Sequence, residues 1–150
     1  MFGKTDDLTI LKTLTSTLND SVNGYRESAE RVESSELTSL FTDFAGQREQ
    51  AAGLLQAEVR RLGGEPDQDG TVLGSIHQTF LDLKAAVTGN DDKAIINEVE
   101  RGEDYLKEKF ETALKNDSLT GESRTVVETA YQSVRQGHDR MSAIKHSLEV

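Results

Sequence analysis

The sequence has no cysteine, and only one of its 150 residues, Pro66, is a proline. Without cysteine, the chain forms no disulfide and holds no metal ion through thiolates. Proline breaks helix interiors, so the long stretches on either side of Pro66 are free to form long helices. Valine and isoleucine are sparse and the apolar residues do not alternate with polar ones, which argues against β-strands.

Long apolar runs are missing as well. No stretch approaches the roughly 18 apolar residues that a membrane-spanning helix needs. The first residues, MFGKTDDLTI, lack the apolar segment of a signal peptide. With the absence of cysteine, these features predict a cytoplasmic protein. The formal net charge of −10 would repel nucleic-acid phosphates and anionic lipids, so neither a nucleic acid nor a membrane is expected as a partner.

The sequence does contain apolar side chains at alternating spacings of three and four residues, the pattern of amphipathic helices. Thr5 suits the N-cap of the first helix. Ser34 and Ser35 separate the first helix from the second, and Gly63 ends the second as a C-cap glycine would. The four long helices predicted from this pattern cover about residues 6–32, 36–62, 91–114 and 122–148.

The connection between the second and third helices, residues 63–90, is long and carries a predicted short helix of its own, from about Thr71 to Val87. Such a connection can return the chain along the bundle before the third helix begins. One long crossover is typical of ferritin-like bundles, whereas an up-down-up-down bundle uses short loops. The sequence therefore predicts a single domain over residues 1–150. Its expected fold is all-α, a ferritin-like four-helix bundle with a long crossover connection carrying a short fifth helix.

The strings LGGEPDQDGTVLGSIHQTFLDLK, EVERGEDYLKEKFETAL and GHDRMSAI resemble a bacterial family of ferritin-like four-helix bundles catalogued only as a domain of unknown function. The resemblance covers the chain from about Leu8 to Leu148. It implies a ferritin-like bundle from a bacterium, linked to stress or stationary-phase survival, and it brings no established activity. One departure from the family pattern is Phe80, where tryptophan is usual.

A ferritin-like bundle raises the question of a di-metal site. Such a site takes a Glu from each of two helices and a Glu-x-x-His pair from each of the other two, because two hard cations need about four carboxylates. The chain lacks the full set: Ala52 stands where a histidine would follow Glu49, and Arg135 stands where a glutamate would precede His138. The metal-ligand candidates that remain are a partial set, Glu49, Glu103 and His138.

Arg48 argues against that site, because it lies on the apolar stripe of the second helix and brings a fixed positive charge to mid-bundle, where a metal ion would sit. We expect it to form a structural ion pair, with Glu103 or Asp20 as its partner. Such a pair can specify helix register more than it stabilises the fold. On that interpretation Glu49 and Glu100 are solvated.

Four glycines fall inside predicted helices, where each costs about 1 kcal/mol relative to alanine. Counting residues along the helices at 1.5 Å each places all four at a similar depth in the bundle. We expect one layer of glycines that lets helices approach closely or makes room for large neighbours such as Arg48. A small pocket beside Glu103 and His138 is the functional alternative. The four are Gly24, Gly46, Gly102 and Gly137.

Two main functions remain open. The first is a non-catalytic, stress-associated bundle that acts by protein binding or self-association; no catalytic residue and no cofactor are expected. A homodimer would use leucines outside the main stripes, Leu14, Leu40 and Leu54. The alternative is an iron or manganese oxidase, peroxidase or iron-handling protein with an atypical site, in which Tyr25 or Tyr131 is a redox-active phenol. A weaker third hypothesis is a small-molecule binder that uses the bundle core.

Overall fold

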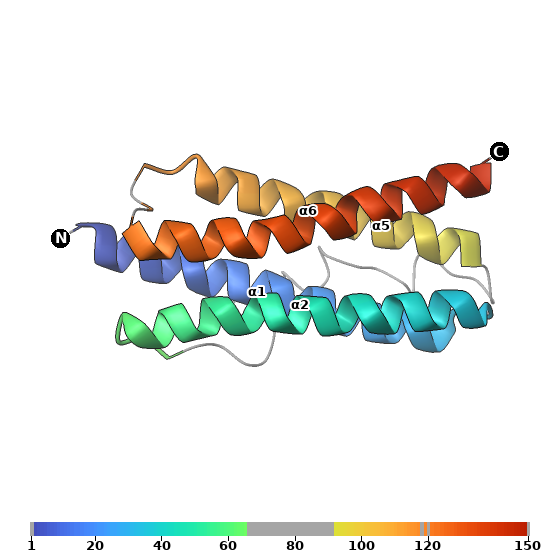
Figure 1. Ribbon diagram of the computed structural model, residues 1–150, viewed down its shortest axis with the longest axis horizontal. Helices are drawn as coiled ribbons and strands as arrows, with labels where there is room; N and C mark the ends of the chain where they lie inside the picture. The colour runs from blue at the N-terminus through green and yellow to red at the C-terminus, as the bar shows by residue number, and fades with distance from the viewer. Residues whose placement is uncertain (1, 66–91, 118, 120, 150) are drawn as a thin grey trace.

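The structure, a computed structural model, describes residues 2–65, 92–117, 119 and 121–149, with side chains described from residue 7 to residue 147 of these ranges. Within them the chain forms four α-helices and no strand, which confirms the predicted all-α four-helix bundle (Figure 1). The helices are α1 (Phe2–Arg31), α2 (Ser35–Arg61), α5 (Asp92–Leu114) and α6 (Gly121–Glu149). The predicted short helix from Thr71 to Val87, and the crossover that contains it, lie outside the described residues.

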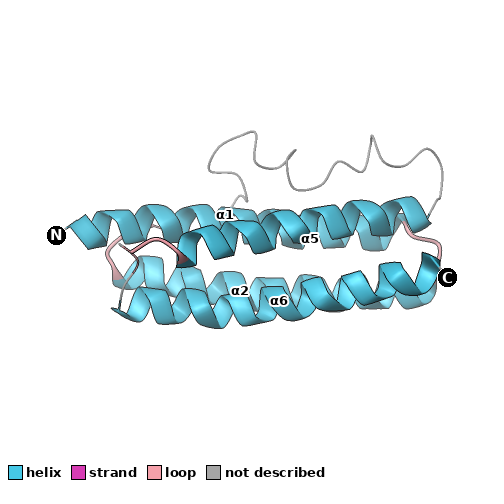
Figure 2. Cartoon of the chain, turned by 90° about the horizontal axis from the view of Figure 1, so that it is seen from above, coloured by secondary structure: helices cyan, strands magenta, loops and turns pink. Residues whose placement is uncertain are grey.

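The four helices form a square bundle of two layers. Helices α1 and α5 make one layer and α2 and α6 the other, as Figure 2 shows. Each helix packs on two neighbours, α1 on α2 and α5, and α6 on α5 and α2. α1 and α2 are antiparallel, as are α5 and α6, whereas α2 and α5, which lie diagonally opposite, run in the same direction (Figure 1). The end of α2 and the start of α5 therefore lie at opposite ends of the bundle.

The turn between α1 and α2 is fixed by side chains from two helices. Ser34 caps α2 through its hydroxyl, which accepts a hydrogen bond from the backbone of Leu37 at 3.3 Å. Asp92, at the start of α5, accepts hydrogen bonds from the backbone N–H groups of Glu33 at 2.8 Å and Ser34 at 3.1 Å. One carboxylate thus ties the first turn of α5 to the α1–α2 turn.

The predicted start of the first helix is wrong. α1 begins at Phe2, so Thr5 lies inside the helix and does not cap it. The residues ahead of Asp6 contain no proline, and their one glycine, Gly3, costs a helix only about 1 kcal/mol. Nothing there stops the helix from extending beyond its apolar stripe.

The C-terminal end of α2 agrees with the cap predicted from the sequence. Gly63 adopts a φ of +88°, the left-handed conformation that glycine takes without strain. Its N–H donates to the carbonyl of Arg60 at 2.9 Å, and the N–H of Gly64 donates to that of Val59 at 2.9 Å. This pair of hydrogen bonds is a Schellman motif, which satisfies carbonyls that the helix end would leave free.

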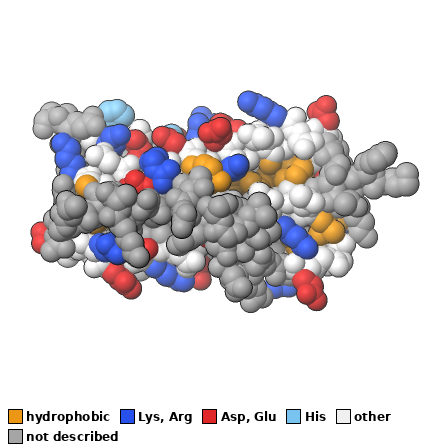
Figure 3. Space-filling model, turned by 180° about the vertical axis from the view of Figure 1, so that it is seen from behind, with side chains coloured by type: hydrophobic (Ala, Val, Ile, Leu, Met, Phe, Trp, Pro, Cys, Tyr) orange, Lys and Arg blue, Asp and Glu red, His pale blue; other side chains and the backbone are white. Residues whose placement is uncertain are grey.

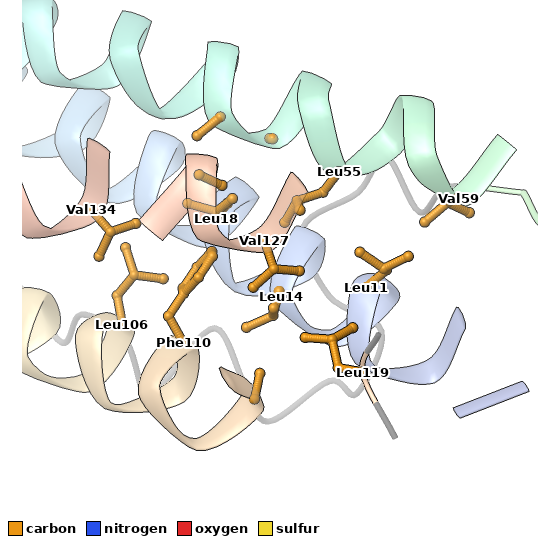
Figure 4. Packing of buried hydrophobic residues seen from close by; sticks show 14 residues of the cluster. Leu11, Leu14, Leu18, Leu55, Val59, Leu106, Phe110, Leu119, Val127 and Val134 are labelled. Atoms are coloured by element: carbon orange, nitrogen blue, oxygen red, sulfur yellow. The ribbon is translucent and has the colours of Figure 1, made fainter. Parts of the chain in front are cut away.

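Apolar side chains fill the bundle in two separate clusters. The cluster nearer the α5–α6 turn includes Leu11, Leu18, Leu55 and Phe110, and Figure 4 shows residues of this cluster converging from all four helices. The other, nearer the α1–α2 turn, includes Phe41, Phe44, Ile95, Ile96 and Met141. A polar layer at mid-bundle separates the two clusters.

The surface is polar and mixed in charge. On the face in Figure 3, Asp and Glu side chains are interspersed with Lys and Arg, and hydrophobic side chains show between them. None of the four described helices combines the length and the apolarity that crossing a bilayer requires.

Candidate functional site: a buried ion pair and an open groove

The polar layer at mid-bundle is built around an ion pair between α2 and α5. Arg48 is 1% exposed and Glu103 is fully buried. Arg48 donates two hydrogen bonds to Glu103, Nη1 to Oε1 at 2.6 Å and Nη2 to Oε2 at 2.6 Å. A bidentate pair of this kind is the strongest interaction that a guanidinium and a carboxylate form. The predicted ion pair of Arg48 is confirmed, with Glu103 rather than Asp20 as its partner.

The other two helices complete the shell around the guanidinium. From α1, the hydroxyl of Ser21 accepts from Arg48 Nη1 at 3.1 Å, and Arg48 Cζ lies 5.6 Å from the ring centre of Tyr25. From α6, the carbonyl of Val134 accepts from Nη2 at 3.5 Å. A cation over an aromatic ring gains further electrostatic stabilisation when both are shielded from water. All four helices therefore contact this one side chain.

The surroundings of Arg48 favour its charged form. Burial alone would lower the pKa of Arg48, but the charge of Glu103, the neighbouring Tyr25 and the hydrogen bonds to Glu103 together outweigh that effect, and the net pKa lies above the usual value. Burial also raises the pKa of Tyr25 well above its usual value, and the charge of Glu103 raises it further. The Tyr25 hydroxyl makes no hydrogen bond of good geometry with the described residues, although it lies close enough to Glu103 for that carboxylate to raise its pKa. Groups held in single protonation states are poorly suited to proton transfer near neutral pH.

Gly137 of α6 makes the room that Arg48 occupies. A Cβ added at Gly137 would collide with Nη2 of Arg48 and lie 3.1 Å from Oε2 of Glu103. Gly24 and Gly102 are also buried, as a glycine layer requires, but Gly46 is exposed, and a Cβ there would meet no atom within 4 Å. The predicted role of making room for Arg48 is confirmed for Gly137, whereas Gly46 makes room for no neighbour, so the expected role of the glycine layer is wrong at that position.

The three predicted metal-ligand residues each have a different partner. Glu49 is exposed and pairs with Arg26, and Glu103 is buried against Arg48. Nε2 of His138 lies 2.6 Å from Oδ1 of Asp104 at the α5–α6 surface. The structure does not bring these three side chains together. Across the described part of the chain, no group of three or more His, Asp or Glu residues is arranged to hold a metal ion. The metal site stays a prediction.

Two tyrosines were candidates for a redox-active phenol. Tyr25 lies beside the ion pair, as given above, and Tyr131 lies nearer the α5–α6 turn. Its hydroxyl donates to Glu111 Oε2 at 2.7 Å, and its ring stacks on Phe110 with centres 6.3 Å apart. Both contacts are ordinary packing for a half-buried tyrosine.

Sequence reasoning gave no role in the core to two buried carboxylates, Asp7 of α1 and Glu58 of α2. Asp20 of α1, which it offered only as the alternative partner of Arg48, lies off the apolar stripe and is 2% exposed. Burial raises its pKa to about 7. The apolar stripe of a helix predicts which residues face the partner helices. It does not predict whether a residue outside the stripe is buried.

A groove of about 920 Å³ lies at the end of the bundle that holds the α1–α2 turn. There α2 and α6 diverge, as Figure 1 shows on its right-hand side. Apolar side chains from three helices form its floor: Leu37 and Leu40, Ile96, and Ile144. Charged and small residues form its two long walls: Glu36, Ser39 and Asp43 on α2, and Arg140, Ala143 and Ser147 on α6. The α1–α2 turn and the start of α5 add Ser34, Asp92 and Lys93 to the lining.

Of the leucines predicted as dimer candidates, only one lies in this groove. Leu40 is half-buried in the floor. Leu14 is 2% exposed and belongs to the core, so it offers no surface. Leu54 is 44% exposed, and it is the one large apolar side chain with this much exposure among the described residues.

A family model described as a domain of unknown function (DUF2383) matches residues 6–116. The match includes both partners of the ion pair and ends before α6, which supplies Gly137. No curated protein matches the chain.

Proposed function

Because the chain belongs to the DUF2383 family, a domain of unknown function, we propose its function from the geometry: a non-catalytic bundle that binds protein through the open groove at the α1–α2 turn. The groove between α2 and α6 carries this proposal. It has the volume of a binding site, about 920 Å³, and an apolar floor with polar walls, the composition of protein-binding surfaces. The link to stress survival that the resemblance implies stays a prediction.

The centre of the bundle supports a non-catalytic role. In a bundle that holds a cofactor, side chains on facing helices point inward and leave room for it. Here Arg48 and Glu103 point inward and bind each other. Their charges cancel, and Ser21, Tyr25 and Gly137 surround them. A ligand or metal ion at the centre of the bundle would have to displace the bidentate ion pair of Arg48 and Glu103.

The absence of cysteine from the sequence makes a direct test possible, since one introduced thiol is a unique attachment point. We would attach a short photo-crosslinker at Ser39→Cys or Ala143→Cys, on the two walls of the groove. Ala57→Cys and Gln132→Cys are exposed positions on the same helices and serve as matched controls. The purified, labelled protein is added to a lysate of the producing cells and irradiated, and we expect discrete protein adducts from the groove positions.

Adducts from the two controls should be absent or much weaker. Equal labelling from all four positions, or no adduct from either wall, would contradict the proposal. The mass of the adduct then separates another protein from a second copy of this chain.

A further inference from the structure

The two walls of the groove have the same residue spacing but opposite charge. On α2, Glu36, Ser39 and Asp43 line the groove. They are spaced by three and four residues, so they lie on one helix face. On α6, Arg140, Ala143 and Ser147 have the same spacing. One wall is therefore acidic and the other carries a positive charge, and each has small residues between or beside its charges.

The charged side chains on the two walls of the groove are accessible to a binding partner. Neither Glu36 nor Asp43 forms an ion pair with a described residue, and both are exposed. Arg140 is exposed and lies over the Phe44 ring, with Cζ 5.9 Å from its centre, and it too has no ion-pair partner in the described ranges. Asp43 and Arg140 face the same groove without pairing across it. The groove thus presents both members of an ion pair, unmatched, on opposite walls.

We propose that the occupant of this groove is a second copy of the same chain, docked about a two-fold axis that runs along the groove. This proposal rests on the proposed function and names its partner. Rotation about such an axis exchanges the walls and keeps each residue at its level along the bundle. The α2 wall of one copy then meets the α6 wall of the other, and Asp43 of each faces Arg140 of its mate.

Charge complementarity selects this partner. A two-fold interface is self-complementary, because the same surface supplies both sides of every contact. The groove meets this condition, with each wall finding its complement on the other wall of an identical surface. A chain with a net charge of −10 needs such local pairing to associate with itself. The half-buried Leu37, Leu40 and Ile144 would lose their remaining exposure to water in the dimer.

The size of the surface sets the expected strength. Thirteen residues line the groove, fewer than the roughly 20–30 residues per partner of a standard interface. We therefore expect a reversible dimer with a Kd on the order of 10 μM, populated at high protein concentration.

The test is a charge exchange measured by sedimentation equilibrium of the full chain across a concentration series. Asp43→Lys and Arg140→Glu each place like charges opposite one another, twice in a two-fold dimer. We expect each single variant to weaken dimerisation by about 10-fold or more. The double variant Asp43→Lys/Arg140→Glu restores opposite charges and should return the Kd to within about 3-fold of the unsubstituted chain.

Glu128→Lys is the matched control, because Glu128 is an exposed acid of α6 outside the groove, and its replacement changes the net charge as Asp43→Lys does. It should leave the dimer unchanged. Circular dichroism confirms that each variant keeps its helices. A monomer at all concentrations, or single variants that dimerise as well as the parent, would overturn the two-fold dimer. Groove-specific adducts to another protein would then leave the groove as a binding site with a different partner, whereas loss of those adducts would remove both proposals.

Discussion

Gly137 and Gly46 both lie in helix interiors, yet they have different surroundings. Gly137 faces Arg48 and Glu103, and a side chain there has no space, whereas Gly46 faces open space. Helix propensity alone treats the two alike and favours alanine at both. The contact with the ion pair is what separates them.

We predict opposite effects of alanine at these two positions. Gly137→Ala should lower the free energy of unfolding by about 1–3 kcal/mol, because the Arg48 guanidinium has to move within a packed core. Gly46→Ala should raise it by about 0.5–1 kcal/mol, since it restricts the unfolded chain and meets nothing in the folded one. Urea unfolding followed by circular dichroism measures both. If Gly137→Ala stabilised the protein instead, Arg48 would have to move without cost. That result would contradict a guanidinium held in place by bidentate hydrogen bonds to Glu103.

The same scale shows what the sequence can predict about single residues. Arg48 was recognisable because a charged residue on an apolar stripe needs a buried partner, and two candidates lay within reach. Gly137 was recognisable because a glycine in a helix interior needs a reason. Asp20, the second of those candidates, lies off the apolar stripe, so the sequence did not show that it is buried. Its burial depends on three-dimensional surroundings that helix periodicity does not contain.

At the scale of elements, the ends of α2 are joined to other helices by carboxylates. Asp92 of α5 holds the turn before α2, and Glu58, near the end of α2, holds the start of α6. Glu58 is 4% exposed. It accepts hydrogen bonds from Arg61 Nε at 2.8 Å and from the Ser123 hydroxyl at 2.7 Å. Its negative charge also lies at the N-terminus of α6, where the helix dipole favours an anion.

The Glu58 contacts predict a pH dependence. The hydrogen bonds from Arg61, with a smaller contribution from Ser123, hold the pKa of Glu58 below its usual 4.5 despite burial. A carboxyl with a depressed folded pKa stabilises the fold above its unfolded pKa, and this contribution is lost as the pH falls through the folded pKa. Glu58→Gln should therefore lower stability by about 1–2 kcal/mol at pH 7. The difference from the parent should shrink below about pH 4.

Glu49→Gln provides the matched control, because Glu49 also pairs with an arginine of the bundle but is exposed. It should change stability by less than about 0.5 kcal/mol at either pH. A Glu58→Gln deficit that is equally large at pH 3 and pH 7 would mean that packing, not charge, gives Glu58 its effect. Urea unfolding at the two pH values measures it.

The element boundaries show where local signals suffice. Gly63 was identified from the sequence because a C-cap glycine has its own chemistry, and it ends α2 as predicted. Ser34 and Ser35 were predicted only as the break between two helices, and Ser34 proves to be the N-cap of α2. The start of α1 was not identified, because no residue before Asp6 forbids a helix and Thr5 is compatible with either role. A boundary that depends on the absence of a stop signal is poorly determined by sequence.

At the scale of the whole molecule, the central polar layer and the groove have different roles. The layer joins all four helices through Arg48 and separates two apolar clusters. Replacing a buried ion pair by apolar residues is often neutral or stabilising, so this pair is better explained as fixing the helix register than as a source of stability. The groove could not be predicted from the sequence, because it arises from the divergence of α2 and α6 rather than from any motif.

The central claim is that the ion pair of Arg48 and Glu103 takes the place that a metal ion or cofactor would need. The most direct measurement is elemental analysis of iron, manganese and zinc bound per chain, on untagged protein incubated anaerobically with each metal and then desalted. We predict no stoichiometric retention of any of the three. Retention of about two ions per chain, as a carboxylate-bridged site holds, would contradict the claim. Glu49, Glu103 and His138 would then be the first residues to test as metal ligands.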